Sequence, residues 1–176
     1  MKYEQFSAIY NALKSISSDE SLNQDNVIGA IKSQLPSDSD AYKEWAEGKF
    51  SLDHVFTTVN DYGAKSKHTL LTCACKLADL KVVDLLLKVG ASVNVAAGDE
   101  NPFTVAIESE WDGSKKDAKA IVDLLMKKVN THVGTAGENN TMVKAVERGN
   151  LKVFEALIEA GASLHRGMWN DSIRVG

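Results

Sequence analysis

One pattern occurs twice in this chain. Residues 80–94 read LKVVDLLLKVGASVN, and residues 151–165 read LKVFEALIEAGASLH. In both stretches apolar residues recur at helical spacing, so each predicts a short helix that packs one face inward. Gly90 and Gly161 follow these helices at the place where a residue of positive φ commonly ends a helix. A repeated unit of this kind predicts stacked copies, which form an extended surface rather than a catalytic pocket.

Further helices are predicted on both sides of the doubled pattern, and no segment shows the alternation expected of a strand. The C-terminal two thirds contain three predicted helix pairs: 70–78 with 80–89, 102–110 with 118–129, and 141–148 with 151–160. The N-terminal third contains four predicted single helices: 3–17, 24–35, a helix through Tyr42 and Trp45 that ends at Gly48, and 51–59.

The three pairs resemble the ankyrin repeat, a unit of about 33 residues with a β-turn and two antiparallel helices. The family's first helix opens with Thr-Pro-Leu-His-x-Ala, and the matching stretches here begin at Thr69, Asn101 and Asn140. Each of these residues can cap a helix, and Pro102 stands at the first helical position. The resemblance implies an all-α, ankyrin-type α-solenoid. A tetratricopeptide array is the nearest alternative, but its Trp-Leu-Gly-Tyr pattern is not found.

The copies are not equally long. The first helix begins 13 residues before the Leu-x-Val position in the first and third copies but 20 residues before it in the middle copy, which places seven added residues at 111–117. In the middle copy Asn130, one place after Val129, is expected to take the left-handed position that ends the second helix, because Asn tolerates it.

Domain organisation follows from the same alignment. Residues 1–60 are expected to form an N-terminal helical cap, because the end of a solenoid has no neighbour on one face. Within them, residues 39–60 are a candidate decayed repeat, and a separate small helical domain is the alternative. Residues 61–176 are expected to hold the repeats, divided at about 61–94, 95–133, 134–165 and a partial 166–176.

Composition narrows the classes of function. With 20 basic and 24 acidic residues the net charge is −4, which argues against sequence-independent binding of nucleic acid. The apolar runs are too short to span a membrane, and no secretory signal follows Met1. Cys73 and Cys75 are expected in the core as free thiols, which points to a reducing cytoplasm. The sequence leaves open whether the protein is delivered into another cell.

No catalytic, cofactor or metal site is predicted. The chain lacks a Gly-rich phosphate loop and a Gly-x-Ser-x-Gly motif, and its four histidines are too scattered for a His-x-x-x-His site. The expected function is therefore non-catalytic binding of another protein by a monomer. Two alternatives remain. The chain is the targeting part of a larger effector or enzyme whose activity lies in residues 1–60 or elsewhere, or it is a scaffold that self-associates.

The resemblance also implies where a partner would bind, namely the turn tips and the exposed face of the first helices. The charges differ between copies, with a basic first tip and acidic second and third tips, which would orient a partner. Trp111 and Trp169 either anchor the partner or cover edges of the core. The candidate binding residues are Tyr62, Lys65, Lys67, His68, Lys76, Asp99, Glu100, Glu108, Trp111, Glu138, Glu147, Arg148 and Trp169.

Overall fold

The computed structural model describes residues 3–59, 65–95, 97, 100–111, 116–128 and 136–159. These residues are mostly helical, as predicted, with one short hairpin. The elements are α1 (Tyr3–Ser17), α2 (Val27–Gln34), α3 (Asp40–Glu47), β1 (Phe56–Val59), β2 (Lys65–His68), α4 (Leu70–Leu77), α5 (Leu80–Lys88), α6 (Pro102–Trp111), α7 (Ala118–Met126), α8 (Ala136–Glu147) and α9 (Leu151–Glu159).

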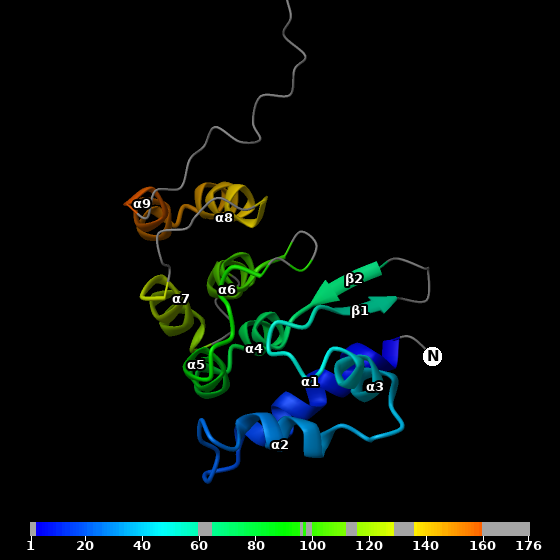
Figure 1. Cartoon of the computed structure of the whole chain (residues 1–176). Helices are drawn as coiled ribbons and strands as arrows, with labels where there is room; N and C mark the ends of the chain where they lie inside the picture. The colour runs from blue at the N-terminus through cyan, green and yellow to red at the C-terminus, as the bar shows by residue number, and fades with distance from the viewer. Residues whose placement is uncertain are drawn as a thin grey trace, which may run out of the picture.

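Six of the helices stack in two columns (Figure 1). The first helices α4, α6 and α8 lie one above another, and the second helices α5, α7 and α9 form the neighbouring column. Each helix contacts the corresponding helix of the next pair as well as its own partner in the pair. The predicted solenoid of helix pairs is therefore confirmed.

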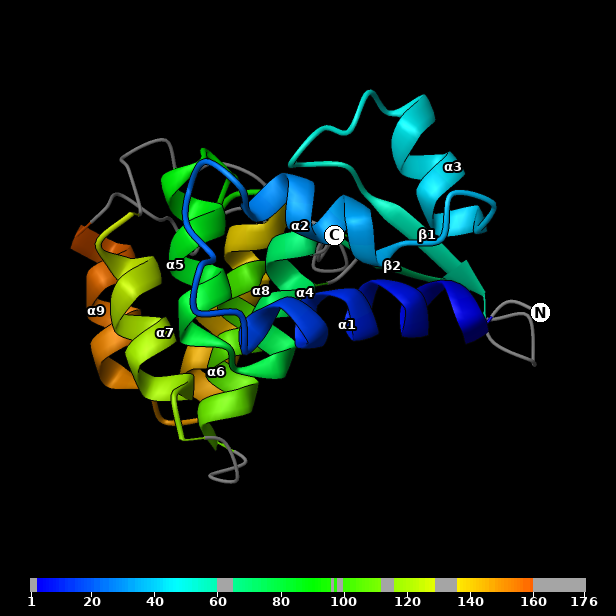
Figure 2. The ribbon, with the colours of Figure 1, turned by 90° about the horizontal axis from the view of Figure 1, so that it is seen from below.

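Helices α1 and α2 extend both columns at the N-terminal end (Figure 2). α1 contacts α4, and α2 contacts α5, so the two occupy the place of a preceding helix pair. Buried residues at helical spacing face the array from α1 and α2: Ile9, Ala12, Leu13, Ile16, Val27 and Ile31. These residues belong to the same continuous apolar core as the repeats.

Residues 39–59, the described part of the candidate decayed repeat, hold one helix and one strand rather than the helix pair that a repeat would need. Helix α3 forms as predicted, with the Ser39 hydroxyl accepting a hydrogen bond from the backbone N–H of Tyr42. After Gly48 the chain turns sharply through Lys49 and Phe50, which have φ of 55° and 54°. The Phe50 ring contacts the rings of Tyr42 and Trp45 edge to face, and these contacts offset the cost of its left-handed backbone.

The helix predicted over residues 51–59 is wrong. Residues 51–55 are turns and irregular chain, and β1 pairs antiparallel with β2, with Phe56 opposite His68 and Thr57 opposite Lys67. Leu52, Val55, Phe56 and Val59 have helical spacing, but Thr57, Thr58 and Val59 are β-branched and favour a strand. The side chain of Glu44 accepts a hydrogen bond of 3.1 Å from the Thr57 N–H, which occupies the outer edge of β1.

The predicted caps of the first helices hold in two copies. Thr69 and Thr72 form a reciprocal capping box at α4, and Asn101 and Thr104 make the same pair of bonds at α6. The third prediction is wrong, because α8 begins at Ala136 and Asn140 lies inside the helix. A residue that is suited to cap a helix therefore does not prevent the residues before it from joining the helix.

Positive φ angles follow three of the described helices, α4, α5 and α8. Gly90, with φ of 102°, ends α5 as predicted. The first helices α4 and α8 also end in this conformation, at Ala78 with φ of 53° and at the equivalent Gly149 with φ of 65°. Val129, Asn130 and Gly161 lie outside the described residues. The added residues of the middle copy do fall between α6 and α7, although Trp111 belongs to the end of α6 rather than to the connection.

Candidate protein-interaction surface

The first turn tip is the hairpin β1–β2, and it carries two of the predicted basic residues. Lys65 and Lys67 occupy alternate positions of β2 and therefore the same face of the strand. The Lys67 side chain is exposed. His68 is only 5% exposed, so its prediction as a surface tip residue is wrong. The alternation of the strand turns His68 inward together with Phe56, its partner across the hairpin.

Glu100, from the second tip, lies against the first repeat. Its carboxylate accepts a hydrogen bond of 2.9 Å from Lys76 Nζ through Oε1, while Oε2 lies 2.7 Å from the same nitrogen. Oε2 is also 3.5 Å from Nδ1 of His68. Burial alone raises the pKa of Glu100, but the contacts with His68 and Lys76 outweigh burial and hold the pKa below its usual value.

Tyr10 of α1 belongs to the same neighbourhood. Burial raises the pKa of its phenol to about 12, and the charges of Cys73 and Glu100 add to that shift. The cluster of Tyr10, His68, Lys76 and Glu100 therefore joins an N-terminal helix, the hairpin, the first helix of one copy and the turn of the next.

A second charged group links the middle and last copies. Glu108 Oε1 on α6 lies 3.1 Å from Lys144 Nζ and 3.9 Å from Arg148 Nη2. Lys144 is also 3.4 Å from Glu147, one turn along α8. Hydrogen bonding to Glu108, together with its charge, raises the pKa of the Lys144 ammonium. These pairs are largely exposed, so each contributes about 1 kcal/mol or less to stability.

Five of the predicted binding residues are thus brought into contacts between neighbouring copies, in the two groups just described: His68, Lys76 and Glu100, then Glu108 and Arg148. Glu147 joins the second group through Lys144. The sequence predicted these residues but not their pairing. Most of these contacts join one position of the repeat unit to a different position of the unit in the next copy.

The remaining candidates are only partly described. For three of them the structure describes the backbone: Trp111 is the last residue of α6, Glu138 lies in the first turn of α8, and Lys65 lies in β2. Tyr62, Asp99 and Trp169 lie outside the described residues. Whether any of these contacts a partner stays a prediction.

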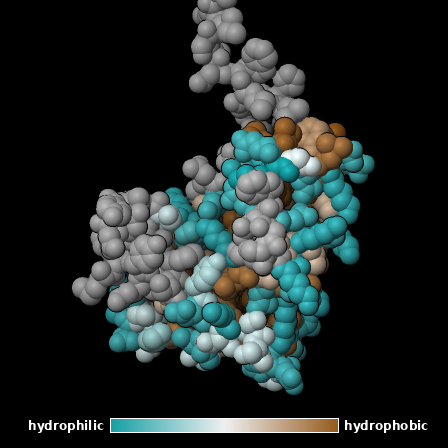
Figure 3. Space-filling view, turned by 180° about the vertical axis from the view of Figure 1, so that it is seen from behind, coloured by the Kyte–Doolittle hydropathy of each residue, from teal (hydrophilic) through white to brown (hydrophobic). Residues whose placement is uncertain are grey.

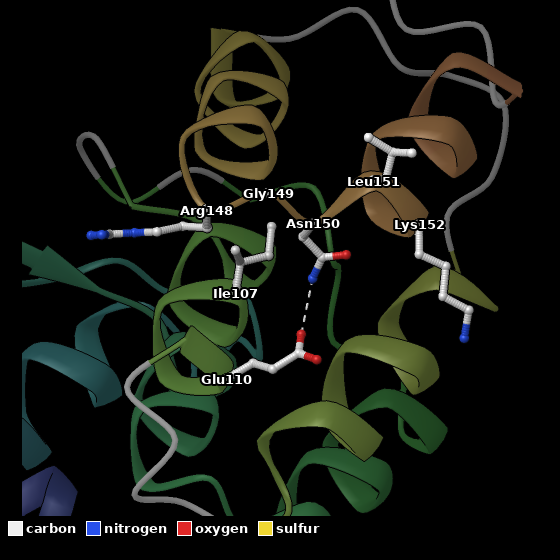
Figure 4. A pocket seen from close by; sticks show the side chains of 7 residues that line it. All are labelled: Ile107, Glu110, Arg148, Gly149, Asn150, Leu151 and Lys152. Atoms are coloured by element: carbon white, nitrogen blue, oxygen red, sulfur yellow. Dashed lines mark hydrogen bonds between the residues drawn. The ribbon is translucent and has the colours of Figure 1, made fainter.

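An open hollow of about 400 Å³ lies between α6 and the turn that joins α8 to α9 (Figure 4). The Asn150 amide donates a hydrogen bond of 2.9 Å to Glu110 across it, and Arg148 and Lys152 extend away from that bond on opposite sides. Leu151 at its rim is 67% exposed. This hollow could not be predicted from the sequence, because it is formed by the contact of two copies.

Both cysteines lie inside the array. Cys73 and Cys75 are free thiols with no exposed surface, as predicted. In the part of the chain that the structure describes, no three His, Cys, Asp or Glu side chains gather as a metal site would require. None of the described helices combines the length and the apolar character needed to cross a lipid bilayer.

Comparison with known proteins agrees with the stacking. The family model for the ankyrin repeat matches residues 66–97, which hold most of β2, α4, α5 and the start of the following turn. A search of curated proteins found no match. The resemblance is therefore confirmed for the first copy, and the two further copies stand on spacing and on their stacking against it.

Proposed function

We propose that this chain, which carries an ankyrin repeat at residues 66–97, is a non-catalytic module that binds a partner protein through its turn tips and the exposed face of its first helices. Ankyrin repeats are protein-interaction units, and the proposal starts from that general role. The finer proposal is that the surface formed by β2, α4, α6 and α8 is the one that the partner contacts.

One observation carries this proposal most directly. The first helices α4, α6 and α8 lie in a single column, and ion pairs between successive copies run along it: Lys76 with Glu100, then Glu108 with Lys144. Side chains that already hold each other lose little conformational freedom when a partner arrives. The column therefore offers a preformed polar surface, with the exposed Lys67 at one end and Glu147 at the other.

In this proposal the charge gradient along the tips is weaker than the one predicted from the sequence. Glu100 is held between Lys76 and His68, so the second tip presents less negative charge to a partner than its sequence suggests. Exposed charges mainly affect the rate of association and the orientation of the partner. Lys67 and Glu147 are the charges expected to steer it.

Capture of partners from native lysate tests the surface. The variant Lys67→Glu with Glu147→Lys reverses both charges without changing the net charge. The matched control is Lys119→Glu with Asp38→Lys, which exchanges exposed charges on α7 and before α3. A partner retained by the wild type and the control but lost by the tip variant supports the proposal. Equal capture by all three proteins would contradict the proposal that the tips and first helices bind the partner.

The N-terminal helices are proposed to be a cap rather than a separate domain, and the contacts of α1 with α4 and of α2 with α5 support this. Removal of residues 1–35 would uncover the apolar faces of α4 and α5. We expect a much lower melting temperature of the remaining helices by circular dichroism. An unchanged melting temperature would instead support an independent N-terminal domain.

A further inference from the structure

One position of the first helices changes from fully buried to exposed along the array. Cys75, Ile107 and Val146 occupy this position in the three copies, because the aligned residues Thr69, Asn101 and Asn140 are spaced by 32 and then 39. Their exposed fractions are 0%, 1% and 61%. Val146 is apolar like the other two, yet within the described residues no helix pair covers it.

The second helices show the same change. Leu87 is 7% exposed, the equivalent Met126 is partly buried, and Ile158 in the last copy is 44% exposed. In the middle copy these side chains lie on the side where the next helix pair stacks, since Ile107 lines a hollow with residues 148–152 and Met126 lines one with Lys152 and Glu155 of α9. Val146 and Ile158 therefore belong to a stacking face that has the composition of an interior interface.

The charges beside this face are alike in the middle and last copies. In the middle copy, Glu108 pairs with Lys144 of the next first helix, and Asp123 Oδ1 is 3.1 Å from Lys152 Nζ of the next second helix. The equivalents of Glu108 and Asp123 in the last copy are Glu147 and Glu155, and both are exposed. At the step from the middle to the last copy, an acidic pair below thus meets basic residues from above, whereas the equivalent residues of the first copy are Lys76 and Asp84.

We propose that the face formed by Val146, Glu147, Glu155 and Ile158, called the end face here, binds a helix of a partner protein that presents an apolar stripe flanked by lysine or arginine. Apolar side chains gather at this end of the molecule in Figure 3. The charge pattern selects the occupant, because a stripe with acidic flanks would bring like charges together. A second copy docked by the same face would suffer that repulsion too.

Binding to the full chain tests the end face with two defined probes. Both are synthetic amphipathic helices of about 20 residues with the same leucine stripe, one flanked by lysines and the other by glutamates. We expect the lysine-flanked peptide alone to bind, as measured by fluorescence anisotropy. Val146→Ser with Ile158→Ser should weaken its binding at least about tenfold. Glu147→Lys with Glu155→Lys should transfer the preference to the glutamate-flanked peptide.

The matched control is Leu151→Ser. Leu151 is more exposed than Ile158, but its equivalent in the middle copy is Lys119, which remains exposed beneath α9. That position is therefore not part of the stacking face, and the control should bind like the wild type. All substituted side chains are exposed, so circular dichroism should show unchanged folding.

Each other outcome overturns the proposal in a distinct way. Equal binding of both peptides, or equal loss with Leu151→Ser, would mean nonspecific apolar contact. A dimer in sedimentation experiments that Val146→Ser with Ile158→Ser dissociates would assign the face to a second copy. Binding by a chain that ends at Glu159 but not by the full chain would assign it to residues 160–176. The single variant Lys67→Glu leaves Glu147 of the end face unchanged, so it should reduce partner capture at the turn tips but keep peptide binding intact. Failure at the turn tips and failure at the end face can therefore be told apart.

Discussion

The side-chain amide of Asn101 donates a hydrogen bond of 2.8 Å to the hydroxyl of Thr141, so the residue that caps α6 also holds α8. Both residues are buried, with exposed fractions of 5% and 2%. The start of one copy and the first helix of the next are thereby tied together by a single side chain.

Replacement of Asn101 should uncouple the last helix pair. Asn101→Ala removes both the cap and the bridge, and we expect a loss of about 2–3 kcal/mol in unfolding free energy. Asn101→Asp keeps an acceptor for the Thr104 N–H but removes the amide donor, so its loss should be smaller. Hydrogen exchange should show faster exchange in α8 and α9 than in α4 and α5. Equal acceleration in all helices would contradict a local bridge.

Ala78 offers a stabilising substitution. Its φ of 53° is unfavourable for a residue with a Cβ, and Gly149 fills the equivalent position of the last copy. Ala78→Gly should therefore stabilise the protein by about 1 kcal/mol, and Gly149→Ala should destabilise it by a similar amount. Chemical denaturation measures both. If Ala78→Gly lowers stability, the entropy that glycine adds to the unfolded chain outweighs the relief of strain.

Gly48 is required by a close neighbour rather than by its backbone. A Cβ at this position would collide with the imidazole of His54, which packs edge to face on Phe56 at 4.7 Å between ring centres. Gly48→Ala should cost about 1–3 kcal/mol. The double variant with His54→Ala should recover part of that loss. Gly29→Ala is the control, because open space surrounds that helical glycine and alanine should stabilise α2 by about 0.5–1 kcal/mol.

The pairing of Glu100 predicts a dependence of stability on pH. Its folded pKa lies below the usual value, so the stabilising contribution is present above the unfolded pKa and is lost as pH falls through the folded one. At neutral pH, Glu100→Gln should cost about 0.5–1 kcal/mol. The difference between wild type and variant should shrink as pH falls below the ordinary carboxyl pKa of 4.5. The exposed Asp38→Asn variant serves as the control, and a difference for Glu100→Gln that stays constant with pH would contradict the pairing.

The buried thiols should report unfolding. Burial raises the pKa of Cys73 to about 12 and that of Cys75 further still, and neither side chain has exposed surface. Thiolates are the reactive form, so Ellman's reagent should label neither cysteine in the native protein and both in denaturant. Rapid labelling without denaturant would show that α4 opens locally.

The helix pairs were predictable because their apolar residues recur at helical spacing and because two copies lie in phase. The hairpin was not, since Leu52, Val55, Phe56 and Val59 satisfy the helical spacing equally well. The burial of His68 and the pairing of Glu100 also escaped prediction, because both depend on contact between one turn and the helix of another copy. The exposure of Val146 also escaped prediction, because it depends on which helix pair has no neighbour stacked on it.

The hairpin limits how this chain can be divided and recombined. β1 follows the N-terminal helices in sequence, whereas β2 leads directly into α4, and the two strands are hydrogen-bonded to each other. A cut at residue 60 would leave half a hairpin on each fragment. A chimera that joins these N-terminal helices to a foreign array should therefore place the junction after His68. Both strands then come from this chain, and the foreign array supplies the residue that caps its own first helix.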